Sequence, residues 1–162
     1  MQWVEFASAC PEIAELAEQR FRKDEAVLVG TLRKDGSPRI SPNEVDFAKG
    51  HLFVSMMWRS KEALDLLRDP RCVVHSVPIT RMNPGGDIKL YGRAVDTPDP
   101  DLRRAFRDTM YARIEWAPEE PEFHLFSLDV REAAYVRFEH DTWETRHWTP
   151  ETGLRKETRS ND

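Results

Sequence analysis

The tightest constraint on the fold is a turn near residue 35 that joins two stretches of β-forming residues. Residues 26–32 (AVLVGTL) are rich in Val and Leu, and residues 38–47 follow after the turn sequence KDGS. An Asp-Gly pair between two such stretches is a strong signal for a β-hairpin. Pro38 and Pro42 lie in the second stretch and cannot donate a backbone hydrogen bond, so we expect that strand to lie at an edge, bent or bulged.

The rest of the chain continues as short β-like stretches separated by tight turns. Strands are expected at residues 52–56, 71–77, 87–95, 123–130, 134–138 and 142–148, helices at residues 10–23, 61–69 and 100–114, and a loop at residues 78–86. The strands do not alternate with helices, which disfavours a parallel sheet. We therefore predict a mainly β fold, an antiparallel sheet closed into a barrel with helices covering its ends.

Composition narrows the class of protein. A chain of 162 residues is expected to form a single domain over residues 1–162, with an ordered core at about residues 8–148 and a polar C-terminal tail that frays. The net charge of −5 disfavours nucleic-acid binding, which needs a basic face. No apolar run is long enough to span a bilayer and the N-terminus lacks signal-peptide features, so we expect a cytoplasmic protein. The two cysteines and five histidines lack metal-ligand spacing, so no metal is expected.

The most informative stretch for function is the point near residue 58 where a strand gives way to a helix. Trp58, Arg59, Ser60 and Lys61 lie between β-forming residues and a helical pattern that ends before Pro70. A helix N-terminus presents free N–H groups and a partial positive charge, so this sequence predicts an anion site best suited to a phosphate. The alternative is an ordinary N-cap serine beside two surface cations.

The order of these features resembles the pyridoxamine 5′-phosphate oxidase-like family of flavin-binding split β-barrels. The resemblance is carried by DGSP at residues 35–38, RSK at 59–61, RDPR at 68–71 and YGRA at 91–94, and it covers roughly residues 10–148. It implies a split antiparallel β-barrel that forms a homodimer, with FMN bound at the subunit interface.

The resemblance also implies which residues bind the cofactor. The strand after the first hairpin would line the flavin ring, and the strand-to-helix junction would bind the cofactor tail. Two residues near the C-terminus would complete the site of the partner subunit, or else pack against their own barrel. The implied cofactor-binding residues are Arg39, Ile40, Ser41, Pro42, Met56, Met57, Trp58, Arg59, Ser60, Lys61, Arg146 and Trp148.

The implied activity is that of a flavin-dependent oxidoreductase that transfers hydride to or from a small organic substrate. The C-terminal substrate-binding arginine and histidine of the true pyridoxamine phosphate oxidases have no clear counterpart here, so vitamin B6 oxidation is not expected. An F420-dependent reductase is an alternative, because Arg59, Lys61, Arg68 and Arg71 could hold its longer acidic tail. A non-enzymatic flavin- or haem-binding protein is another. No catalytic residue is assigned, since the flavin itself carries the hydride chemistry.

Overall fold

The computed structural model describes residues 1–78, 80, 83 and 85–160, and four residues of the expected loop (79, 81, 82 and 84) lie outside this part. The described residues form eight strands and four helices. In chain order these are α1 (Trp3–Ala9), α2 (Pro11–Asp24), β1 (Ala26–Leu32), β2 (Pro38–Ala48), β3 (His51–Met57), α3 (Lys61–Arg68), β4 (Arg71–Ser76), β5 (Asp87–Asp96), α4 (Pro100–Ile114), β6 (Phe123–Glu139), β7 (Thr142–Thr149) and β8 (Gly153–Ser160). None of the helices within these ranges is both long and apolar enough to cross a membrane.

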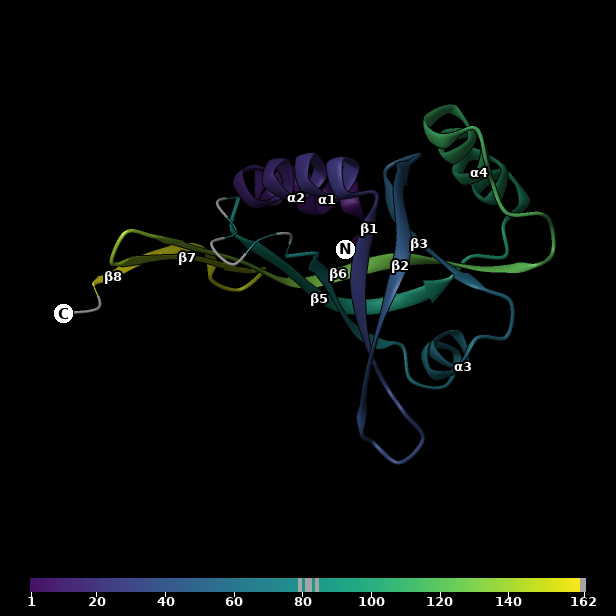
Figure 1. Ribbon diagram of the computed structural model, residues 1–162, viewed down its shortest axis with the longest axis horizontal. Coiled ribbons are helices and arrows are strands. Elements are labelled where there is room, and N and C mark those ends of the chain that lie inside the picture. Colours follow the sequence, from purple (N-terminus) through teal and green to yellow (C-terminus); the bar gives the residue numbers. More distant parts are fainter. Residues whose placement is uncertain (79, 81–82, 84, 161–162) are drawn as a thin grey trace.

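Six of the strands close into an antiparallel barrel. Their order around the wall is β1-β2-β3-β6-β5-β4, and β4 returns to β1. The closure depends on β3, which pairs with β2 on one side and with β6 on the other. The predicted mainly β fold, a split antiparallel barrel with helices, is therefore confirmed (Figure 1).

The helices cover the barrel and divide its apolar residues into two cores. α1 and α2 lie side by side (Figure 1), and they bury Phe6, Ile13 and Phe21 together with the inward-facing residues of the barrel. α4 lies against the outer face of the wall, where Phe106 and Met110 pack on residues of β3 and β6. As a result β3 is buried on both faces from residue 52 to residue 56.

The two ends of the chain depart from expectation. Residues 123–139 form one strand of 17 residues where the sequence indicated two, and its second half continues into a ribbon with β7 and β8 that projects from the barrel (Figure 1). The expected frayed tail is wrong, because residues 153–160 pair with β7 along its whole length. At the N-terminus α1 was missed, although its Trp3 and Phe6 are buried. In both places a tertiary partner supplies contacts that the local sequence does not show.

The prolines of β2 lie in the half of that strand that has only one neighbour. Pro38 and Pro42 pair across to β1, whereas β3 starts pairing with β2 only at residue 44. Residues 38–43 therefore have no second strand beside them among the described residues, which confirms the expected edge position. A proline is tolerated there because no hydrogen bond is needed on the open side.

Candidate functional site

The strand-to-helix junction forms as the sequence predicts. β3 ends at Met57, and the backbone N–H of Ser60 donates to the carbonyl of Met57 at 3.0 Å, which closes the turn. Arg59 adopts a left-handed conformation with φ of 57°, which lets the chain reverse within three residues. Ser60 is the N-cap of α3, and its hydroxyl accepts a hydrogen bond from the backbone N–H of Ala63 at 3.4 Å.

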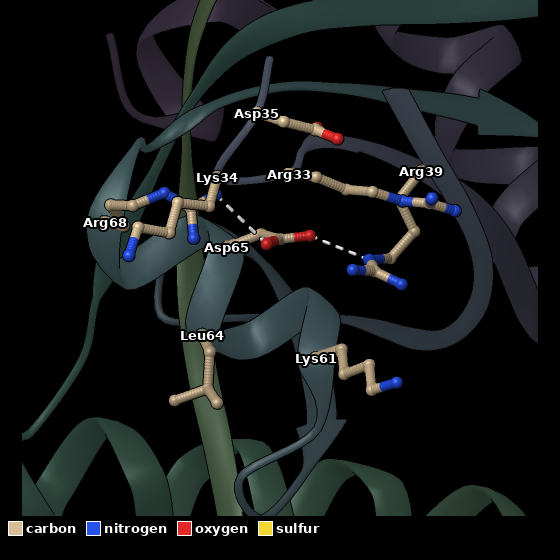
Figure 2. Close-up of a pocket in the computed structure, with 8 residues that line it drawn as sticks. All are labelled: Arg33, Lys34, Asp35, Arg39, Lys61, Leu64, Asp65 and Arg68. Atoms are coloured by element: carbon tan, nitrogen blue, oxygen red, sulfur yellow. Dashed lines mark hydrogen bonds and ion pairs between the residues drawn. The ribbon is translucent and has the colours of Figure 1, made fainter. Parts of the chain in front are cut away.

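A cationic cleft of about 540 Å³ lies between the β1–β2 hairpin and α3. Its lining combines five cationic side chains with two carboxylates and one leucine. The residues are Arg33, Lys34, Asp35, Arg39, Lys61, Leu64, Asp65 and Arg68. Figure 2 shows Arg33, Arg39 and Lys61 reaching toward the same side of α3, while Arg68 approaches Asp65 from the other. This excess of positive charge favours an anion over a cation in the cleft.

The buried carboxylate of Asp65 holds cationic side chains of the cleft in place. The carboxylate is 4% exposed and accepts hydrogen bonds from Thr31 Oγ1 at 3.2 Å, Arg39 Nε at 2.7 Å and Arg68 Nη2 at 3.0 Å. Burial by itself raises the pKa of Asp65, but the hydrogen bonds from Arg39, Arg68 and Thr31 together outweigh it, so the pKa lies below its ordinary value. The ionised carboxylate thus fixes two of the five cations.

The strand predicted to line a flavin ring presents its residues to two sides. Arg39 points to the cationic cleft, and Ser41 donates its hydroxyl hydrogen to Glu62 of α3 at 3.2 Å. Ile40 and Pro42 belong to the opposite face because side chains alternate along a strand, and both are exposed, Ile40 to 71%. Two of the four residues therefore face α3, and the other two form an open apolar surface.

The residues at the end of β3 and just after it differ in their exposure to solvent. Met56 is buried, and its side chain packs in the barrel core. Met57 is 77% exposed and Trp58 is 51% exposed. The indole of Trp58 stacks on the imidazole of His124, with ring centroids 4.5 Å apart and an interplanar angle of 13°. Met57 and Trp58 thus present an apolar surface beside the junction.

A second cleft, also about 540 Å³, lies between the middle of β2, the end of β3, α4 and the loop after α4. We call it the acidic cleft, because its lining contains four glutamates and one arginine, together with aromatic residues. The residues are Glu44, Ser55, Met56, Met57, Arg107, Tyr111, Glu115, Trp116, Ala117, Pro118, Glu119, Glu122 and Phe123. Ser55 donates to Glu44 at 3.2 Å, and Arg107 Nε donates to the carbonyl of Pro118 at 2.8 Å. Because Met57 lines it and Lys61 lines the cationic cleft, the junction lies between the two.

The C-terminal pair of predicted residues lies apart from the junction. Trp148 is buried and packs edge-on against Phe6 of α1, with ring centroids 5.1 Å apart. Arg146 forms ion pairs with Glu144 at 2.6 Å and with Glu12 at 3.4 Å. In this chain both side chains hold the ribbon against the N-terminal helices, which is the packing alternative considered for them.

Sequence reasoning missed several residues that line the clefts. Asp65 could have been found, since positions 61, 65 and 68 share one face of a helix. Arg33 and Lys34 flank the turn of the hairpin, so their proximity to α3 depends on tertiary structure. The acidic cleft had no local signal, because it is made where α4 meets parts of the barrel wall that are distant along the chain.

Comparisons with known proteins agree with this architecture. A family model described as pyridoxamine 5′-phosphate oxidase matches residues 13–137. No curated protein sequence matches the chain significantly. Among solved structures, a heme binding protein from Mycobacterium smegmatis is 18% identical with a TM-score of 0.63, over 93% of this chain and 58% of that one.

Two further solved structures have the same fold. PhzG from Burkholderia lata 383, in complex with tetrahydrophenazine-1-carboxylic acid, is 13% identical with a TM-score of 0.62, over 91% of this chain and 88% of that one. A protein from Clostridium acetobutylicum related to general stress protein 26 is 14% identical with a TM-score of 0.63, over 86% of this chain and 97% of that one. At these identities the likeness concerns the fold.

Proposed function

Since the chain belongs to the pyridoxamine 5′-phosphate oxidase family, we propose that it is a flavin-dependent oxidoreductase that transfers hydride to or from a small organic substrate. The observation that carries the proposal is the cationic cleft beside an exposed apolar surface at the junction of β3 and α3. An FMN molecule matches this arrangement, because it has an anionic phosphate at one end and a flat, largely apolar ring at the other.

The phosphate would lie in the cationic cleft. Lys61 has no ion-pair partner in the part of the chain described, and Arg39 uses only its Nε in the bond to Asp65. Arginine and lysine donors are the usual partners of phosphate oxygens, and the N-terminus of α3 adds free N–H groups. Anion binding would also relieve the repulsion among cations held close together.

The flavin ring would lie along Ser41, Met57 and Trp58. Ring binding favours an apolar surface with a few polar contacts, which these residues supply. When bound, the flavin supplies the hydride chemistry, and the protein orients the ring and excludes water. The exposed Ile40, Met57 and Trp58 also suit a homodimer whose interface covers the ring. Arg146 and Trp148 are left out of the proposed site because each already has partners within its own chain.

The acidic cleft would receive the substrate. It shares Met57 with the ring surface, so a molecule bound there would approach the flavin from the side away from the phosphate. Four glutamates against one arginine favour a neutral or cationic substrate over an anionic one. Tyr111 and Trp116 are exposed aromatic groups that suit an aromatic or cationic body.

An F420-dependent reductase is a second candidate that one observation favours. The cations do not end at the phosphate position but continue to Arg33, Lys34 and Arg68 along the cleft. A single phosphate would not contact all of these, whereas the longer acidic tail of F420 would reach them. The two candidates therefore differ in which cations they need.

Cofactor titration of matched variants tests both candidates. Arg39→Ala combined with Lys61→Ala should weaken FMN and F420 alike, by about tenfold or more, because each lost charge-assisted hydrogen bond contributes about 1.5–3 kcal/mol. Arg33→Ala combined with Lys34→Ala should weaken F420 alone. Arg104→Ala is the control, since Arg104 is an exposed α4 residue outside the cleft that pairs with Asp101 at 3.3 Å. Unchanged affinity in the first variant would show that the phosphate position is wrong.

A further inference from the structure

Three aromatic rings form a column that runs from the barrel wall to the surface at the junction. Phe126 and His124 are neighbours on β6, with ring centroids 6.1 Å apart and an interplanar angle of 17°. Trp58 completes the column at 4.5 Å from His124. His124 is 9% exposed, whereas Trp58 presents half of its surface to solvent. The outer face of the indole is thus open, and its inner face is supported.

His124 is packed between the rings of Phe126 and Trp58. Its Nε2 atom is buried and has no hydrogen-bond partner among the described residues, although an unpaired buried polar atom costs free energy. In the ladder between β6 and β3, His124 is opposite Met56, one residue before β3 ends. An aromatic or aliphatic residue would fill the same space without that cost. The retained imidazole therefore needs an explanation at the site beside it.

We propose that His124 is a positioning residue that holds the indole of Trp58 flat, so that its outer face becomes a stacking platform for the ring of the bound flavin. The inference rests on the proposed function, because the flavin supplies the ring. Trp58 lies between β3 and α3 and not within either element, so only its contact with His124 fixes the plane of the indole among the interactions described. Offset stacking of flat rings then orients the flavin at the mouth of the acidic cleft.

The charge state of His124 gives this platform a distinctive pH dependence. Burial lowers the pKa of His124, Asp96 of β5 raises it, and Arg103 of α4 lowers it again, so that the net pKa lies below 6.5. The imidazole is neutral in the folded protein at pH 7 and gains a proton only as pH falls below 6.5 toward the lower folded value. The added charge requires hydration and also interacts with the face of the indole, so the stack, and with it the environment of Trp58, changes as the pH falls.

Substitutions at His124 separate stacking from simple packing. His124→Phe keeps a flat ring and cannot titrate, whereas His124→Leu fills the space without a ring. At pH 7 we expect His124→Phe to bind riboflavin within about twofold of the wild type. His124→Leu should bind it about fivefold more weakly, in the range expected for loss of one aromatic pair. Riboflavin is the probe because it lacks the phosphate, so its affinity reports contacts to the ring and not contacts to the cationic cleft.

A measurement without flavin tests the pairing itself. The difference in tryptophan emission between the wild type and Trp58→Phe isolates the signal of Trp58 from that of the other four tryptophans. When His124 is present, this difference in emission should change with pH, with a midpoint below pH 6.5. When His124 is replaced by Phe, the difference between the proteins with and without Trp58 should not change with pH.

The outcomes distinguish the two proposals. If neither riboflavin nor FMN binds the wild type, the proposed function is wrong, and the proposed role of His124 is overturned together with it. If both bind, but His124→Leu binds riboflavin as tightly as His124→Phe, only the positioning role is overturned. A Trp58 signal that still titrates in the His124→Phe background would overturn it as well.

Discussion

Replacing Asp65 by asparagine should destabilise the protein by removing the charge that holds two arginines of the cationic cleft. The carboxylate accepts bonds from Arg39 at 2.7 Å and from Arg68 at 3.0 Å, and an asparagine side chain in its place would keep a single acceptor oxygen and turn an NH₂ group toward these donors. Each hydrogen bond to a charged group contributes about 1.5–3 kcal/mol. Since Arg39 is 20% and Arg68 is 39% exposed, solvent screening favours the lower end.

The expected loss in the free energy of unfolding for Asp65→Asn is therefore about 2–3 kcal/mol. For a chain of this length, 1 kcal/mol corresponds to roughly 2–4 °C in Tm, so Tm should fall by roughly 4–12 °C. Urea denaturation measures the difference directly and, unlike guanidinium chloride, does not screen the ion pairs.

The pH dependence of this loss gives a second check. The folded pKa of Asp65 lies below its ordinary value of 3.8, so its stabilisation is fully present above pH 3.8 and is lost as pH falls through the folded pKa. The deficit of Asp65→Asn should be constant from pH 7 to pH 5 and shrink as the pH is lowered below 3.8. Asp69→Asn is the matched control, because Asp69 pairs with Arg71 on the surface and should matter little at pH 7. Equal stability of the two variants, or a deficit unchanged in acid, would refute the reasoning.

Three further substitutions test other parts of the fold. Trp148→Ala should lower the free energy of unfolding by about 3–5 kcal/mol while leaving riboflavin affinity unchanged, since this buried ring packs on Phe6 away from the junction; urea denaturation and a riboflavin titration measure both. Gly92→Ala should cost roughly 2 kcal/mol or more on urea denaturation, because the added Cβ would lie 2.2 Å from the carbonyl oxygen of Asp129. Ser60→Ala should cost only about 0.5–1 kcal/mol by the same measurement, since the capping bond is long at 3.4 Å.

The barrel could be predicted because its signals are local. The Asp-Gly turn and the alternating strands each act over a few residues, and the structure places these elements within one or two residues of expectation. β8 could not be predicted in this way. Its residues are polar and exposed, and what orders them is the ladder to β7, which depends on β6 extending beyond the barrel.

Only the strand-to-helix junction of the candidate site could be predicted from the sequence. Ser60 and Lys61 could be placed because an N-cap and a strand end are visible in the sequence, and their positions relative to α3 are as expected. Met56 shows the limit of that reasoning, since period-2 alternation puts it inward and Met57 outward, and the two were not separated beforehand. Arg33 joins the site through the hairpin, and Glu44 faces α4 through the barrel closure, so neither follows from local pattern.

The separation of charge on the two sides of the junction limits how a flavin can bind in the proposed site. The net charge of −5 conceals this separation, because five cations gather in one cleft and four carboxylates in the other. A phosphate placed in the acidic cleft would meet Glu44 and its neighbours in a partly desolvated space, where repulsion between like charges is stronger than in water. The reverse orientation is therefore disfavoured twice, by repulsion there and by lost attraction at Lys61. In the proposed site the same charges would keep an anionic substrate away from the ring and leave the approach open to a neutral or cationic one. Orientation of the cofactor and selection of the substrate would then have one physical cause.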